Sequence, residues 1–187
     1  MEDGAMSDDK KSLYLKTDMA LDGSGYLLTL EVNDDTARVL RPDDALVYAS
    51  SLLKAVAVAT HDAAVLRQLV EMLEIPSKEA VHMITVLRAD RPESDPADTY
   101  PLIFSPQVSK GFTPFIEVRL GEQVMGLWTM DDARGHAEGV LTGSHTADLD
   151  SAYYRVLIGS VRTNKSRARQ AVADLYSLRD PECSHFL

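Results

Sequence analysis

The sequence predicts an α+β fold in which a unit of three strands and three helices occurs twice about an approximate two-fold axis. Two observations lead to this prediction. One long segment of the sequence occurs in two similar copies, and the strand and helix patterns around each copy follow the same order. Residues 40–69 and 128–157 align without a gap, and ten of the 27 positions from 43 to 69 carry the residue found 88 positions later. Chance gives about two or three identities at average composition, so the segment indicates an internal duplication. The identical pairs are Asp43 and Asp131, Asp44 and Asp132, Ala45 and Ala133, Ala49 and Ala137, Leu53 and Leu141, Ala59 and Ala147, Asp62 and Asp150, Ala64 and Ala152, Arg67 and Arg155, and Leu69 and Leu157.

A change in composition separates the two copies. Prolines and acidic residues dominate residues 91–99, as expected of a linker. The acidic start of the chain lacks periodicity, which predicts a disordered tail. The predicted divisions are a tail (1–11), copy one (12–90), the linker (91–99), copy two (100–179) and a C-terminal tail (180–187).

Each copy begins with segments in which apolar and polar residues alternate, the pattern of half-buried strands. Turn-forming residues separate the segments, for example at 22–25 and 33–35, so each copy is predicted to start with an antiparallel three-stranded sheet. The predicted strands are Ser12–Thr17, Tyr26–Val32 and Thr36–Leu40 in copy one, and Leu102–Phe104, Pro114–Leu120 and Gln123–Trp128 in copy two.

Helical spacing of apolar residues follows the sheets. Pro42 suits the first position of a helix, and Thr129 suits an N-cap with Asp132 in a variant of the capping box. Thr60-His61-Asp62 predicts a break and a new cap. The expected helices are 42 to about 59, Ala63–Leu73 and 77 to about 89 in copy one, and 130 to about 147, about 150 to 161 and about 165 to 178 in copy two.

The third helices of the two copies also align, once an insertion is allowed in the loop before the second of them. They align at an offset of 91, which implies three inserted residues in the loop before the second of them. In copy one this helix has a predicted buried stripe of Val81, Ile84 and Leu87.

Because one small sheet cannot cover a long helix, we expect the copies to bury their first and second helices against each other, so that one chain resembles a homodimer.

Bulk composition favours a soluble cytoplasmic protein. The net charge of −10 opposes broad binding of nucleic acid or anionic lipid. Cys183 is the only cysteine, which fits a reducing compartment. The longest apolar run, Leu52–Ala59, is interrupted by Lys54 and is far shorter than the roughly 20 residues of a membrane span.

Adjacent acids at 43–44 and 131–132 are the first candidate site, since paired carboxylates bind divalent cations or transfer protons. The favoured interpretation is simpler, because acidic residues stabilise the first turn of a helix. The histidines show no ligand spacing, and no phosphate-binding loop or nucleophile motif is present. We therefore predict no catalytic residue, metal or cofactor. The five histidines are His61, His82, His136, His145 and His185.

Shared charged residues form the second candidate. Asp62, Arg67, Asp150 and Arg155 could form ion pairs between the copies, although arginines lying along the helix in solvent are the favoured interpretation.

The basic segment 162–169 is the third candidate. Arg162, Lys165, Arg167 and Arg169 could contact a phosphate backbone in an arrangement loosely like a helix-turn-helix. A solvated surface is favoured, because copy one is not basic at the corresponding place.

The expected function is a non-enzymatic binding or adaptor protein whose partner is another protein. One alternative is a DNA-binding regulator that uses the basic segment. The other is an enzyme with its site at the joint between the copies, which predicts a deep pocket lined by polar residues.

Overall fold

The computed structural model describes residues 13–20, 22–32, 35–89 and 102–179. They form an α+β fold with two three-stranded antiparallel sheets, as predicted, but with four α-helices in place of the six expected. The predicted tails and the predicted linker (91–99) lie outside the described residues. The elements are β1 (Leu13–Met19), β2 (Tyr26–Val32), β3 (Asp35–Leu40), α1 (Pro42–Arg67), the π-helical turn η1 (Gln68–Met72), α2 (Ser77–Ala89), β4 (Leu102–Val108), β5 (Pro114–Leu120), β6 (Gln123–Trp128), α3 (Met130–Gly159) and α4 (Lys165–Arg179).

Both sheets have the simple order of a meander, β1-β2-β3 and β4-β5-β6. All six predicted strands are present, although β1 and β4 extend further than expected. The register between the second and third strands shifts between Leu30 and Glu31 in the first sheet and between Val118 and Arg119 in the second. These two irregularities are 88 residues apart (118 − 30), the same spacing as the sequence repeat.

The predicted helix break at residues 60–62 is wrong. α1 runs through it without interruption, and α3 likewise passes its expected break, so each half has two α-helices instead of three. Thr60 and Asp62 suggested a cap because their side chains often bind free N–H groups at helix starts. Here Thr60 Oγ1 donates to the carbonyl of Val56 within the helix, and Asp62 is fully buried with Arg88 bound to its carboxylate.

The three-residue insertion predicted before the last helix is also wrong. α2 and α4 begin at Ser77 and Lys165, again 88 residues apart (165 − 77). The loops before them have the same conformation, with a left-handed residue at Glu74 (φ 53°) and at Arg162 (φ 56°). Matching backbone hydrogen bonds close both loops, from Ile75 N to Leu69 O and from Thr163 N to Leu157 O, each 2.9 Å.

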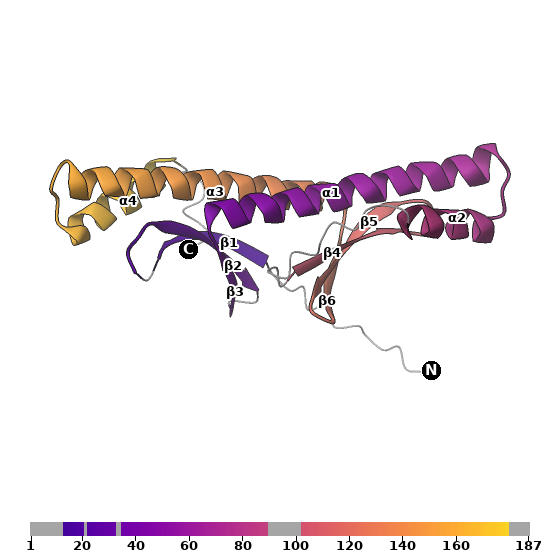
Figure 1. Cartoon of the computed structure of the whole chain (residues 1–187), viewed down its shortest axis with the longest axis horizontal. Coiled ribbons are helices and arrows are strands. Elements are labelled where there is room, and N and C mark those ends of the chain that lie inside the picture. Colours follow the sequence, from indigo (N-terminus) through magenta and orange to yellow (C-terminus); the bar gives the residue numbers. More distant parts are fainter. Residues whose placement is uncertain (1–12, 21, 33–34, 90–101, 180–187) are drawn as a thin grey trace.

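α1 and α3 lie side by side and run in opposite directions (Figure 1). Ser144 Oγ of α3 donates to the carbonyl of Pro42 at one end of the contact, and Thr60 of α1 reaches Met130 at the other. The helices then diverge to opposite ends of the molecule. There α2 folds back beneath α1 and α4 folds back beneath α3, forming two arms (Figure 1).

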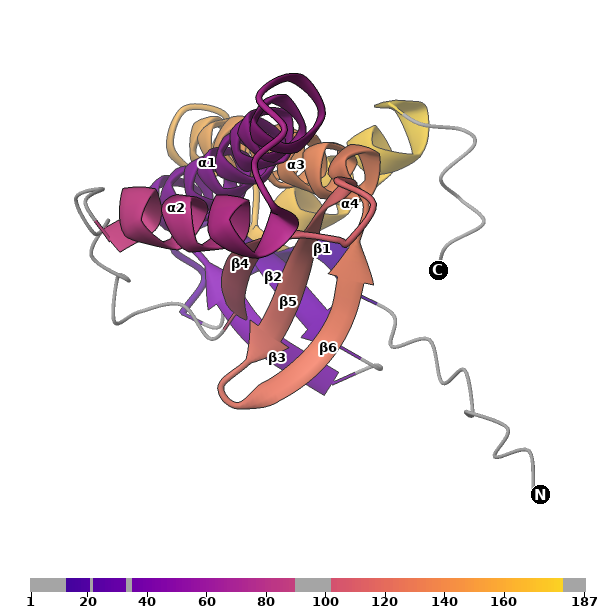
Figure 2. The ribbon, with the colours of Figure 1, turned by 90° about the vertical axis from the view of Figure 1, so that its right-hand side faces the viewer.

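Each long helix packs on the sheet of the other half. α1 lies mainly against β4 and β5, whereas α3 lies mainly against β1 and β2. Both sheets are on the same side of the helix pair (Figure 2). The exchange means that neither half covers its own helix, so the central core draws on both sheets.

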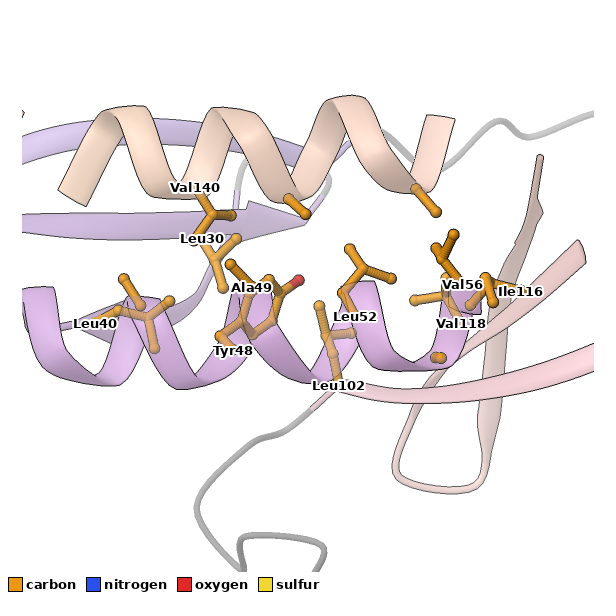
Figure 3. Close-up of a cluster of buried hydrophobic side chains, with 14 of the residues drawn as sticks. Leu30, Leu40, Tyr48, Ala49, Leu52, Val56, Leu102, Ile116, Val118 and Val140 are labelled. Atoms are coloured by element: carbon orange, nitrogen blue, oxygen red, sulfur yellow. The ribbon is translucent and has the colours of Figure 1, made fainter. Parts of the chain in front are cut away.

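The central core lies where the two helices meet the two sheets (Figure 3). Leucine, valine and isoleucine side chains of β2 and β5 fill it, and alanines on both helices allow close approach. Six alanines, in three pairs that are each 88 residues apart, are fully buried: Ala45, Ala49, Ala59, Ala133, Ala137 and Ala147. Each arm has a small separate cluster, around Leu66, Ala80 and Ile84 in one and around Tyr154, Ala168 and Val172 in the other.

By length and composition, the helical stretch Pro42–Met72 is apolar enough to cross a membrane, with a mean hydropathy of 1.2 in its best window. Nearly half of that window (44%) is buried inside the protein. A buried core helix meets the same criteria, so this property alone does not indicate a span.

Replacing two glycines of α3 by alanine, one at a time, tests how closely this helix approaches β2. A Cβ at Gly143 would lie 2.7 Å from Leu28 Cδ1, whereas a Cβ at Gly135 meets nothing within 4 Å. We expect Gly135→Ala to raise the free energy of unfolding by about 0.5 to 1 kcal/mol through helix propensity. The free energy of unfolding of Gly143→Ala should be about 1 to 3 kcal/mol lower than that of Gly135→Ala, because Leu28 is buried and must shift. Equal gains in chemical denaturation would contradict this packing.

Candidate binding surface

A polar contact between the two long helices joins Tyr48 and His136. The Tyr48 hydroxyl and His136 Nε2 are 3.0 Å apart, and the two residues are 88 positions apart in the sequence. Along both helices this contact lies between the Ser144–Pro42 and Thr60–Met130 contacts. The pair thus marks the centre of the α1 and α3 contact.

Aromatic rings surround this pair and exclude water from it. Tyr48 meets Phe104 edge-on at 5.2 Å between ring centroids, and Trp128 lies 4.8 Å from the His136 ring. Burial lowers the pKa of His136 from 6.5 to about 4 and raises the pKa of Tyr48 well above its usual range. Both groups are therefore neutral near pH 7, which suits a structural hydrogen bond inside a core.

A second buried polar group is Asp62 of α1. Arg88 Nε of α2 donates to its carboxylate at 2.7 Å, and His61 Nδ1 lies 3.5 Å from the other oxygen. Leaving such a carboxylate buried without a partner costs about 3 to 5 kcal/mol. The pair therefore fixes α2 against α1 in the first arm.

The four residues considered for ion pairs between the copies are divided between the arms. Asp62 and Arg67 lie in the second half of α1, while Asp150 and Arg155 lie in the second half of α3, which points the opposite way (Figure 1). Arg155 Nε donates to the carbonyl of Ser151 in its own helix. The structure does not bring these four residues together across the halves.

The adjacent acids at 43–44 and 131–132 all lie in the first turns of α1 and α3. The predicted capping box is confirmed, since Thr129 Oγ1 accepts from Asp132 N at 3.1 Å and Asp132 Oδ2 accepts from Thr129 N at 3.3 Å. Among the residues that the structure describes, no group of three His, Cys, Asp or Glu side chains is placed to hold a metal ion.

The four basic residues gather at the outer end of the second arm. Arg162 lies in the loop, the other three lie in the first turns of α4, and all four side chains are exposed. Asn164 Oδ1 caps α4 by accepting from Arg167 N at 2.9 Å. α4 folds back along α3 instead of projecting from it, so it does not stand out as a recognition helix would (Figure 1).

The outer flank of α2 is an exposed apolar surface that the sequence did not predict. Only Ala80 and Ile84 of this helix are buried, so the predicted buried stripe is wrong at Val81 (55% exposed) and Leu87 (46%). Met83 and Val86 are similarly exposed, at 44% and 48%. We call Met83, Val86 and Leu87 the α2 flank, because their spacing places them along one side of the helix.

The corresponding positions of α4, 88 residues later, are less apolar. They hold Ala171, Asp174 and Leu175, on a helix that packs through Ala168 and Val172 just as α2 packs through Ala80 and Ile84. The same packing therefore works without a continuous apolar flank. Apolar periodicity alone could not show which side of α2 is covered, because both sides carry large apolar residues.

Comparison of the chain with family models, with curated proteins and with solved structures gives no match.

Sequence reasoning also missed the Tyr48 and His136 contact. The signal available in the sequence was that Tyr48 and His136 align with each other when residues 40–69 are aligned with residues 128–157, since they are 88 positions apart. Knowing that this position lies at the centre of the helix pair requires the packing arrangement, which the pattern of apolar residues does not specify.

The buried imidazole predicts a specific dependence of stability on pH. An unfolded chain binds a proton at this histidine near pH 6.5, but the folded protein binds it only near pH 4. Between these values the unfolded state holds more protons, so the free energy of unfolding should fall as the pH is lowered, by up to about 1.4 kcal/mol per pH unit from this group.

Denaturant titrations at several pH values between 4 and 8 measure this dependence. His136→Gln should flatten the slope below pH 6.5, because glutamine cannot take up the proton. His82→Gln, on the exposed surface of α2, should leave the slope unchanged. An unaltered slope in His136→Gln would show that another group causes the loss of stability.

Proposed function

We propose that the chain is a non-enzymatic binding protein of the cytoplasm, built by internal duplication as a single-chain pseudo-dimer, and that its partner is another protein. The α2 flank is the contact surface, and its occupant is the apolar side of a helix of that partner. The observation that carries the proposal is the exposure of Met83, Val86 and Leu87, between 44% and 48% each, on a helix whose own packing does not need them.

The constant spacing of 88 residues supports the duplication. It relates features that arise independently of one another: the strand irregularities, the left-handed loop residues, and the starts of α1 and α3. It also relates Asp62 to Asp150, which are both buried. Two unrelated halves would not be expected to agree at each of these levels.

The comparison of α2 with α4 supports the binding surface. An exposed apolar side chain gains about 25 cal/mol for each Å² that a partner covers, whereas an aspartate at the same place favours solvent. Residues spaced by three and four positions form a ridge that packs into the groove of another helix. A helical partner with a matching apolar side therefore suits the α2 flank.

Two observations favour protein binding over the alternatives from the sequence. The basic residues of the second arm sit on a chain of net charge −10, and α4 lies back along α3 (Figure 1). The strongest buried polar contacts, at Tyr48 and at Asp62, serve the packing of helices. Neither observation points to a surface for DNA or to a reaction.

Replacing the α2 flank with the residues of α4 tests the proposal. A photoreactive amino acid at position 86 captures the partner in native cells, and binding is then measured between purified proteins. Met83→Ala with Val86→Asp should weaken binding at least tenfold, because burying an aspartate against an apolar helix is costly. The matched control, Lys78→Ser with His82→Gln, transfers α4 residues at polar positions of the same helix and should bind normally.

Circular dichroism and thermal melting establish that both variants fold. Equal affinity of the wild type and Met83→Ala with Val86→Asp would exclude the α2 flank as the contact surface. Hydrolysis or another reaction catalysed by the purified chain would overturn the non-enzymatic assignment.

A further inference from the structure

The two arms end in tips of opposite charge, and we propose that the tip of the first arm binds the tip of the second arm of another copy of this chain. The acidic tip is residues 71–79, with three glutamates and one lysine, net −2. The basic tip is residues 159–167, with two arginines, one lysine and no acid, net +3. This self-association is separate from the α2 flank and needs no other protein.

The opposite charges stand at equivalent positions of one backbone conformation. Glu74 and Arg162 are the left-handed residues of the two loops, and Glu79 and Arg167 lie in the first turns of α2 and α4. All four side chains are exposed. Among the described residues, none of the four side chains takes part in an ion pair, so each remains able to meet a partner's charge.

Local structure gives no reason for a basic tip. Basic side chains are unfavourable at the positive end of a helix, yet Lys165 and Arg167 occupy the first turn of α4, where no acidic residue is present. An acidic surface placed against α4 would relieve this repulsion. The tip of the first arm is such a surface, and every copy of the chain carries it.

Apolar side chains at both tips add contact area. Met72 and Leu73 are 75% and 59% exposed at the acidic tip, and Val161 is 61% exposed at the basic tip. Leu73 and Val161 are themselves equivalent positions, 88 residues apart (161 − 73). A contact between tips therefore brings apolar side chains together at its centre, surrounded by opposite charges, which is the usual organisation of protein interfaces.

The arrangement of the arms determines what kind of assembly results. The tips lie at opposite ends of the longest axis of the molecule (Figure 1). Joining an acidic tip to a basic tip is a head-to-tail contact, and copies placed end to end in this way leave one tip of each kind free, so they form open chains. The contact is small, so the association should be weak and should depend on concentration.

The overall charge of −10 does not prevent this contact at moderate salt. Charges more than about 8 Å apart are largely screened at physiological ionic strength, so the nearest opposite charges dominate. High salt screens the exposed pairs themselves and should dissolve the chains of molecules.

Sedimentation velocity of the purified full-length chain tests the proposal over roughly 10 to 500 µM protein, the range suited to a small contact. In about 20 mM NaCl the weight-average mass should rise continuously above 20.6 kDa with concentration. In about 500 mM NaCl it should return to that of one chain. A mass that stays at that of one chain in low salt would overturn the proposal.

Charge exchange provides the decisive control. Glu74→Arg with Glu79→Arg makes both tips basic, and Arg162→Glu with Arg167→Glu makes both tips acidic. Each variant alone should remain monomeric because like tips repel, whereas an equimolar mixture should associate and recover the salt sensitivity of the wild type. The control variant, Glu138→Arg with Asp148→Arg, changes the net charge by the same amount as Glu74→Arg with Glu79→Arg. Its substitutions lie on the exposed surface of α3, away from the tips, so it should associate as the wild type does.

An equimolar mixture that remains monomeric, with both variants folded by circular dichroism, would show that the tips do not bind each other. Association of either variant alone would show that the opposite charges are not the cause.

Discussion

The contact between α1 and α3 is the interaction on which the rest of the structure depends. Each helix crosses to the sheet of the other half, so neither sheet would retain its cover if the helices separated. Six shared alanines let the helices approach, and the Tyr48 and His136 hydrogen bond lies at the centre of their contact. A buried hydrogen bond with specific geometry favours one alignment of two otherwise smooth, alanine-lined surfaces.

Away from this central contact, the two halves have similar backbone conformations but expose different side chains. The first arm carries the apolar α2 flank and an acidic tip, while the second arm has Ala171, Asp174 and Leu175 and a basic tip at the corresponding positions. Packing explains the residues that agree between the halves. The residues that differ between the halves are not constrained by packing, and both proposed binding surfaces consist of such residues.

Sequence patterns predicted the strands and the starts of the four α-helices that form, because these depend on local alternation, turn chemistry and capping. The capping box at Thr129 and Asp132 illustrates this success. The expected break at Thr60 to Asp62 failed because the Asp62 carboxylate is satisfied by Arg88, 26 residues away, and local propensity contains no information about such a partner. The exposed sides of Val81 and Leu87 were missed for a related reason: an apolar residue is buried only if tertiary packing reaches it.

Cleavage between the halves tests most directly the claim that one chain forms a pseudo-dimer with a shared core. A protease site placed within residues 91–99 allows the folded protein to be cut once, and native mass spectrometry then reports whether the halves remain together. We expect one particle of unchanged composition that melts in a single transition, at a temperature that now rises with protein concentration. Two halves that separate and each melt cooperatively as monomers would contradict the shared core.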